Sequence, residues 1–106
     1  MPDIETIRSH FDSDSVYVTQ HASQRYRERG IGAKDIRNAV FTGEIIEHYP
    51  DDHPSPSCLV MGVAIDGRQL HVCLGQGVDS SHIITAYFPS SEKWEADGKT
   101  RKERRQ

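Results

Sequence analysis

The sequence predicts an α+β fold, in which N-terminal helices pack on an antiparallel sheet of about four strands. Two observations support this prediction. Apolar residues recur at helical spacing up to about residue 43, and from residue 44 onward the chain has strand composition with turn signals between segments. The helices therefore precede the main strands, and this segregation is typical of α+β domains.

Three helices are expected. Residues 2–11 place apolar side chains at i, i+3 and i+7 behind an acidic first turn, as in an amphipathic helix. A second helix is bracketed by Thr19, a natural N-cap, and Gly30, a natural C-terminal cap. A third starts after Gly32 and ends before Gly43, and its apolar stripe makes it a packing helix.

Four strands are expected after the helices, and one short extended segment before the second helix. The strands cover 44–49, 58–65, 68–75 and 82–88, and the extended segment covers 16–19. The strand over 58–65 is apolar throughout, as in a strand covered on both faces, so we expect it in the middle of the sheet. Three prolines between 50 and 56 indicate an exposed, rigid loop.

An Asp-Gly pair after the apolar run predicts a two-residue hairpin turn. This register puts Gly62 opposite His71, which leaves room above the histidine. It also puts Cys73 opposite Val60, on the same face as Cys58. Two cysteines at this spacing exclude a disulfide framework and a four-ligand zinc site. We expect buried free thiols. In the predicted register a strained disulfide between Cys58 and Cys73 is the alternative, although the reducing cytosol disfavours it.

The 106 residues are expected to form one α+β domain over 1–98, followed by a basic, disordered tail over 99–106. The tail holds five basic residues and one acidic residue, whereas the whole chain has a formal net charge of −3. Such a tail is either solvated or binds nucleic acid non-specifically. No apolar run reaches the roughly 20 residues that cross a bilayer, and no signal-peptide pattern is present, so we expect a cytoplasmic protein without membrane contact.

The second predicted helix carries a row of cations. His21, Arg25 and Arg29 stand at i, i+4 and i+8, so they share a face. Like charges at i and i+4 repel by about 0.2–0.5 kcal/mol unless an anion lies between them. Arginine binds phosphate in bidentate fashion and histidine can transfer a proton, so the row suits phosphodiester binding or cleavage. The alternative is a solvated face with Glu28 paired to an arginine.

A second group lies on the predicted strands. His71 shares a strand face with Gln69 and Cys73, and Thr85 shares a face with Tyr87. A histidine near a tyrosine and a threonine could supply an acid or base and donors for a phosphate oxygen. The alternative is a histidine hydrogen-bonded as part of the structure.

A third group surrounds the proline loop and contains His48, Asp51, Asp52 and His53. These side chains are metal-ligand types, but their spacing fits an exposed polar loop better than a closed site. Glycine-rich phosphate loops, nucleophile elbows and dinucleotide fingerprints are absent from the sequence. We expect no metal and no cofactor.

Five segments in order make the chain similar to the DUF4258 family of small bacterial proteins. They cover 21–31, 35–40, 43–52, 56–60 and 83–87, and the similarity runs over roughly 16–100. That family in turn resembles RelE-like, BECR-fold ribonucleases of toxin type, in which helices pack on an antiparallel sheet whose other face holds RNA. Many such toxins have a small zinc-finger antitoxin of the YgiT type as partner.

The resemblance implies that His21, Arg25, His71, Thr85 and Tyr87 are site residues, and the helix row and the predicted hairpin add Arg29 and Arg68. Four are candidates for catalysis and three for binding: His21, Arg25, His71 and Tyr87 in the first group, Arg29, Arg68 and Thr85 in the second. One departure weakens the nuclease interpretation. RelE-type toxins surround the scissile phosphate with several basic side chains on the sheet, whereas here only Arg68 lies on the predicted strands.

The leading hypothesis is therefore a metal-independent endoribonuclease of toxin–antitoxin type. His21 or His71 would move the proton of the 2′-hydroxyl or of the leaving oxygen, and Arg25 and Arg29 would stabilise the phosphorane. This chemistry requires His21 and His71, or His71 and Tyr87, to converge around one cleft.

Two alternatives remain at this point. The first is a non-catalytic module that binds RNA or an acidic protein through the face of His21, Arg25 and Arg29. The second is a structural role, in which His21 and Arg25 bond backbone carbonyls and hold the helix on the sheet. If the row and the strand residues lie on opposite sides of the sheet, binding is favoured over catalysis.

Overall fold

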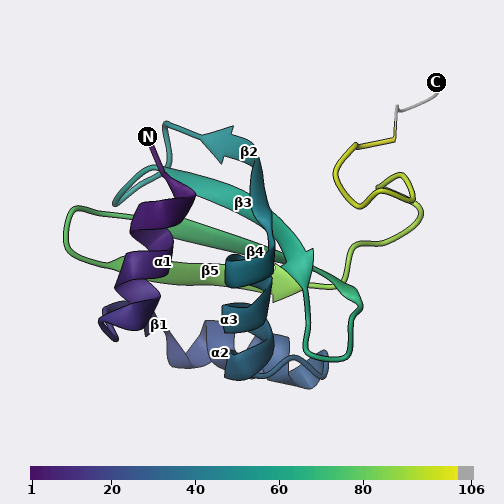
Figure 1. Ribbon diagram of the computed structural model, residues 1–106, viewed down its shortest axis with the longest axis horizontal. Helices are drawn as coiled ribbons and strands as arrows, with labels where there is room; N and C mark the ends of the chain where they lie inside the picture. The colour runs from purple at the N-terminus through teal and green to yellow at the C-terminus, as the bar shows by residue number, and fades with distance from the viewer. Residues whose placement is uncertain (103–106) are drawn as a thin grey trace.

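A computed structural model describes residues 1–102 of the chain. It contains three helices, α1 (Ile4–Asp12), α2 (Gln20–Glu28) and α3 (Ala33–Thr42). The five strands are β1 (Val16–Val18), β2 (Glu44–Tyr49), β3 (Ser57–Val63), β4 (Gln69–Gln76) and β5 (Ser81–Tyr87). They form one sheet in the order β1-β5-β4-β3-β2, with α1 and α3 in front of it and α2 below in the view of Figure 1.

The predicted α+β class is confirmed, with one addition to the sheet. β1, expected only as a short strand or an extended segment, pairs parallel with β5 from Val16 opposite Ser81 to Val18 opposite Ile83. All other strand pairs are antiparallel. The middle position belongs to β4, not to the apolar strand β3, which lies between β4 and β2.

The helices start where the capping residues predict. Thr19 accepts a hydrogen bond from the Ala22 amide at 3.1 Å, and Gly30 adopts a φ of +79°, a conformation that glycine takes without strain. At α3, the Asp35 side chain accepts from the Gly32 amide at 2.8 Å. The same carboxylate accepts from Ile65 at 3.0 Å, which ties α3 to the β3–β4 hairpin.

The predicted register of this hairpin is wrong by one residue. Met61 lies opposite His71, and Gly62 lies opposite Leu70. The reason is a three-residue loop over 65–67 in place of the two-residue turn: the Ala64 amide donates to the carbonyl of the residue after the loop at 2.8 Å. Gly67, with a φ of +89°, supplies the left-handed residue that this loop requires.

Gly62 serves helix packing rather than the space above His71. A Cβ atom at this position would lie 2.0 Å from the Ala39 carbonyl oxygen, so only glycine lets α3 approach β3 this closely. The shifted register also separates the cysteines. Cys58 stands opposite Leu74 on the helix side, and Cys73 stands on the other side of the sheet. Both thiols are free, as expected, but only Cys58 is buried, whereas Cys73 is partly exposed. The shared face predicted for the two cysteines is wrong.

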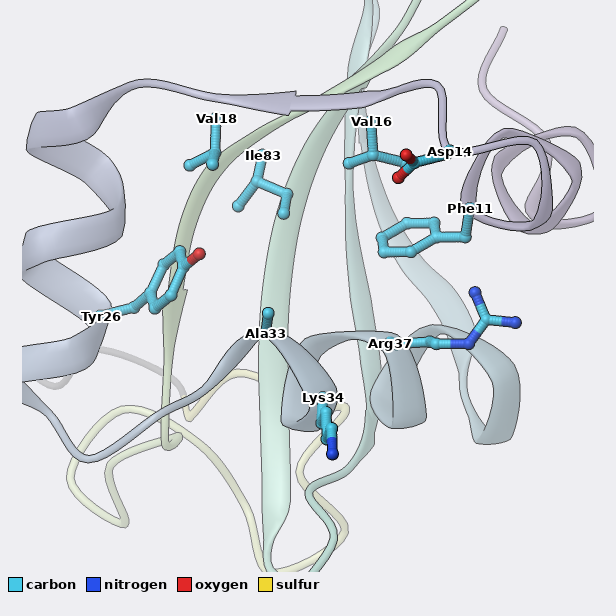
Figure 2. Close-up of a pocket in the computed structure, with 9 residues that line it drawn as sticks. All are labelled: Phe11, Asp14, Val16, Val18, Tyr26, Ala33, Lys34, Arg37 and Ile83. Atoms are coloured by element: carbon cyan, nitrogen blue, oxygen red, sulfur yellow. The ribbon is translucent and has the colours of Figure 1, made fainter.

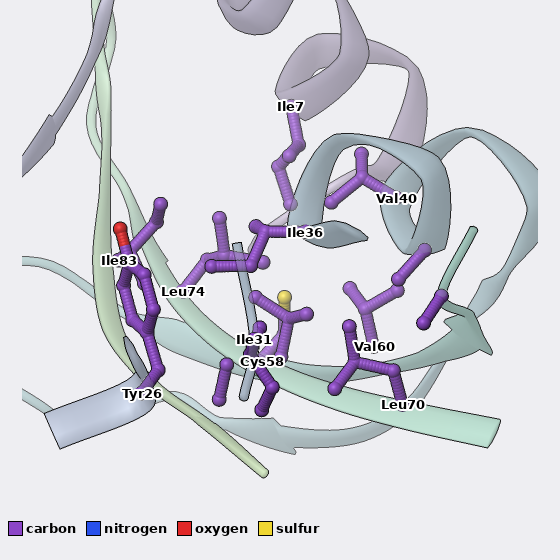
Figure 3. Packing of buried hydrophobic residues seen from close by; sticks show 14 residues of the cluster. Ile7, Tyr26, Ile31, Ile36, Val40, Cys58, Val60, Leu70, Leu74 and Ile83 are labelled. Carbon is purple, nitrogen blue, oxygen red and sulfur yellow. The ribbon is translucent and has the colours of Figure 1, made fainter. Parts of the chain in front are cut away.

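One hydrophobic core fills the space between the helices and the sheet. In Figure 3, Ile36 and Val40 of α3 are directed at sheet side chains such as Val60 and Leu74. The residues of β3 and β4 that belong to this core alternate along each strand, so the residues between them face away from the helices. We call this second side of the sheet the open face.

The chain after β5 also belongs to the folded unit. Residues 89–102, here called the C-terminal segment, contain the buried Trp94, which forms an isolated bridge with Arg101. Lys99 pairs with Glu44 at 3.1 Å. Lys99 and Arg101 thus both contact the sheet, and the predicted boundary between domain and tail at residue 99 stays a prediction. Residues 103–106 of the predicted tail lie outside the described residues. Within 1–102, no helix is long and apolar enough to cross a bilayer.

Candidate functional site

Cross-strand pairing arranges the open face in three rows. The first row holds Tyr17, His82, Gly75, Ser57 and Tyr49; the second holds Thr85, Cys73, Leu59 and Glu47; the third holds Tyr87, His71, Met61 and Glu44. The strand candidates from the sequence therefore lie on neighbouring rows of one surface.

His71 is enclosed on this surface. Its side chain is 0% exposed, and the Trp94 ring stands edge-on against it, with 4.4 Å between ring centroids. The Nε2 atom lies 2.6 Å from the carbonyl oxygen of Gly98. Because a carbonyl only accepts, Nε2 carries the hydrogen, and Nδ1 accepts from the Tyr87 hydroxyl at 3.4 Å. Both ring nitrogens are thus engaged within the protein.

Burial acts against ionisation of both partners in this pair. It lowers the pKa of His71, because the imidazolium loses its hydration, although the Gly98 carbonyl opposes the shift. It raises the pKa of Tyr87 for the same reason, since the phenolate is the charged form there. Neutral His71 and neutral Tyr87 are therefore the stable forms at neutral pH, which suits a structural hydrogen bond better than proton transfer.

The acidic end of the same face is neutralised by the C-terminal segment. Arg101 donates two hydrogen bonds to Glu47, at 2.7 and 3.0 Å, and Tyr49 donates a third. The Arg101 bonds hold the pKa of Glu47 below its usual range. Burial, and then the bond to Glu47, raise the pKa of Tyr49. The cations on this part of the face are thus paired with acids.

α2 lies on the other side of the sheet. Its buried side chains Ser23 and Tyr26 face the domain, and Tyr26 belongs to the hydrophobic core. His21 and Arg25 are exposed, and neither side chain has a hydrogen-bond or ion-pair partner within 1–102. The structural role predicted for them, bonding to backbone carbonyls, is therefore absent from the described structure.

Arg29 differs from the other two members of the row. Its guanidinium donates to the Ala86 carbonyl at 2.9 Å and to the Thr85 hydroxyl at 3.3 Å. β1 pairs with β5 only as far as Ile83, so Arg29 covers β5 backbone beyond the end of β1. This arginine links the end of α2 to the rim of the open face.

The candidate residues therefore form two groups rather than one cleft. His71 meets Tyr87, and Arg29 meets Thr85, but the structure does not bring His21 or Arg25 to His71. The helix row and the strand histidine therefore do not share a cleft, because α2 packs through Tyr26 on the side opposite to His71, whereas His71 and Tyr87 do meet.

Arg68 is not positioned as a phosphate ligand on the sheet. It lies at the hairpin loop, where it pairs with Asp66 at 2.8 Å and stacks over the Phe88 ring at 3.9 Å. In the proline loop, Asp52 accepts a hydrogen bond from the buried Ser57. Across residues 1–102, no group of three or more histidine, cysteine, aspartate or glutamate side chains lies close enough to hold a metal ion.

Sequence reasoning missed the partners that enclose His71. Trp94, Gly98 and Arg101 come from a polar segment without periodicity. The available signal was Trp94 itself, the single tryptophan of the chain. A large aromatic side chain in such a segment usually buries its surface somewhere.

A family model described as "Domain of unknown function (DUF4258)" matches residues 18–88. The chain belongs to this family. The match spans the helix row on α2 and ends just beyond Tyr87, so the C-terminal segment that covers His71 lies outside it. No curated protein and no solved structure matches the chain.

Proposed function

We propose that this DUF4258 protein is a non-catalytic RNA-binding module that holds a phosphate chain on the exposed face of α2. The observation that carries the proposal is the separation of the two groups: His21 and Arg25 are exposed and unpartnered in the described structure, whereas His71 is enclosed on the opposite side of the sheet.

The electrostatics of α2 favour an anionic ligand. The face of the row carries the exposed His21 and Arg25, Arg29 follows at the helix end, and Glu28 is the one acid within the helix. Arg27, two positions from Arg25, lies on another side of the helix. A guanidinium binds a phosphate through two parallel hydrogen bonds, which makes Arg25 the strongest contact of the set. A phosphate beside Arg25 would also relieve the repulsion between Arg25 and Arg29, which stand at i and i+4.

The enclosure of His71 argues against catalysis by the same protein. Cleavage of an RNA phosphodiester needs a group that takes the 2′-hydroxyl proton and cations that stabilise the phosphorane. Here both nitrogens of His71 are bonded, and the nearby Arg101 is occupied by Glu47. The resemblance to RelE-like, BECR-fold proteins is what favours RNA over other polyanions.

One contact keeps a metal-independent endoribonuclease as second candidate. The half-buried Tyr87 hydroxyl lies 3.4 Å from His71 Nδ1, so Tyr87 could take the 2′-hydroxyl proton while passing its own to Nδ1. The 2′-oxygen would then attack phosphorus, and water would protonate the leaving 5′-oxygen. The raised pKa of Tyr87 and the lowered pKa of His71 both oppose this relay. In this candidate, a small zinc-finger protein of YgiT type is the expected partner.

Fluorescence anisotropy with labelled single-stranded RNA tests the proposal. Arg25→Ala should weaken binding about 5- to 10-fold, because a charge-assisted contact contributes about 1–1.4 kcal/mol. Arg27→Ala is the matched control: this side chain bonds the Ser23 hydroxyl at 3.0 Å and should change affinity less than about 2-fold. The logarithm of the binding constant should also fall linearly with the logarithm of the salt concentration.

The same samples decide between the two candidates. RNA incubated with the protein in EDTA should remain intact. Cleavage that disappears in Tyr87→Phe would establish the nuclease instead, and absence of RNA binding at low salt would refute the module.

A further inference from the structure

A pocket of about 310 Å³ opens on the helix side, next to β1. Figure 2 shows it between β1 and the start of α3, with Tyr26 of α2 at one end and Phe11 of α1 at the other. The walls are apolar and include Val16, Val18 and Ile83. None of the candidate RNA-binding residues on α2 lines it, so the pocket is independent of the proposed function.

Tyr26 provides a polar atom inside this apolar space. Its side chain is 5% exposed, yet its hydroxyl has no hydrogen-bond partner within the part of the chain that the structure describes. In Figure 2 the hydroxyl points into the pocket toward Ile83 and away from the body of α2. Within the described residues no fully buried side-chain nitrogen or oxygen lacks a partner, so this hydroxyl is open to the pocket, where water or a ligand can bond it.

Positive charge predominates at the α3 side of the pocket. Ala33 and Lys34 occupy the first turn of α3, whose amides have no partner within the helix and carry the positive end of the helix dipole. The Lys34 side chain has no ion pair within residues 1–102. Arg37 also lines the pocket, with its guanidinium bonded to Asp12 at 2.8 Å.

Two acidic side chains, Asp14 and Asp35, lie at or near the pocket and could offset this positive charge. Asp14 lines the pocket from the turn before β1, on the side opposite to α3. Asp35, in the first turn of α3, is occupied by the amides of Gly32 and Ile65. An anionic group is therefore favoured at the α3 side, and an apolar group over the rest of the space.

We propose that this pocket binds a small monocarboxylate with a compact apolar body. The volume corresponds to about ten water molecules at about 30 Å³ each, which sets the size of the ligand at about ten non-hydrogen atoms. The apolar body packs on Phe11, Val16 and Ile83, the carboxylate lies toward Lys34 and the α3 amides, and the Tyr26 hydroxyl donates one hydrogen bond.

Titration with 3-phenylpropionate, followed by amide chemical shifts, tests the proposal. The acid should shift the signals of Val16, Val18 and Lys34 saturably, with a Kd of about 1 mM for a ligand of this size. The neutral 3-phenylpropanamide, which has the same shape, should bind at least about 5-fold more weakly because it lacks the charge.

Two variants identify the contacts. Tyr26→Phe keeps the ring and removes the hydroxyl, so it should weaken the acid about 3- to 5-fold. Lys34→Gln should reduce the preference for acid over amide, because only the α3 amides then remain, whereas the control Lys93→Gln, on the C-terminal segment, should leave it unchanged. Shifts that do not saturate, equal binding of acid and amide, or unchanged affinity in Tyr26→Phe would overturn the proposal. None of these results depends on RNA binding.

Discussion

The row on α2 and the cluster around His71 use similar residue types in opposite ways. His21 and Arg25 are exposed and lack partners in the described structure, whereas His71 is fully buried, with both nitrogens bonded and a tryptophan ring against it. An exposed cation without a partner contributes little to stability and is free to bind. A buried histidine whose bonds are all satisfied contributes to stability and is withdrawn from binding. The difference teaches that burial and partners, rather than residue type, separate the two roles.

The largest effect is expected at the contact between Trp94 and His71. Trp94→Ala removes a 3% exposed aromatic side chain and leaves a cavity above the histidine, so the free energy of unfolding should fall by about 3 kcal/mol. Urea denaturation measures it. Trp94→Phe keeps an aromatic ring and should cost about 1 kcal/mol. A loss below about 1 kcal/mol in Trp94→Ala would show that the C-terminal segment is not part of the folded unit.

His71 should make stability depend on pH. Burial lowers its folded-state pKa below the value of about 6.5 in the unfolded chain, so below that pH the unfolded state binds a proton that the folded state does not. The free energy of unfolding should therefore fall from pH 7 to pH 5, by at most about 1.4 kcal/mol per pH unit. His71→Gln should flatten this slope, and an identical slope in the variant would assign it to other groups.

A smaller effect on the free energy of unfolding should distinguish Arg29 from Arg25 within the row on α2. Arg29→Ala removes the bonds to Ala86 and Thr85 and should cost about 1 kcal/mol of stability. Arg25→Ala, one turn earlier on the same helix, should change stability by less than about 0.5 kcal/mol. Thermal and urea unfolding of the two variants make the comparison. Equal losses would mean that the row acts as one structural unit.

Local signals predicted the parts of the fold that depend on nearby residues. The caps at Thr19, Gly30 and Gly32 and the order of the main elements follow from residues a few positions apart. The register of the hairpin did not, because an Asp-Gly pair suits both a two-residue turn and the observed three-residue loop with Gly67 at positive φ. Because the loop has three residues and not two, the cross-strand partner of His71 is Met61 instead of the predicted Gly62.

The candidate site depended on contacts between distant segments, which spacing does not report. The parallel pairing of β1 with β5 joins residues about 65 positions apart. The cover over His71 comes from Trp94 and Gly98, in a segment without periodicity, and it forms only because β2, β4 and β5 together present the surface that receives it. The strand pattern and the family resemblance placed His71 among the candidates, but its enclosure could be seen only in the assembled sheet.

RNA affinity, measured in one variant of α2 and one variant of His71, tests whether RNA binds the face of α2 rather than the surface around His71. Anisotropy titrations of the double variant His21→Ala/Arg25→Ala and of His71→Gln, at the same low salt and with folding checked by circular dichroism, compare the two groups. The double variant should lose affinity by about 10-fold or more, and His71→Gln should bind as tightly as the wild-type protein. Affinity lost in His71→Gln and kept in the double variant would contradict binding on the face of α2.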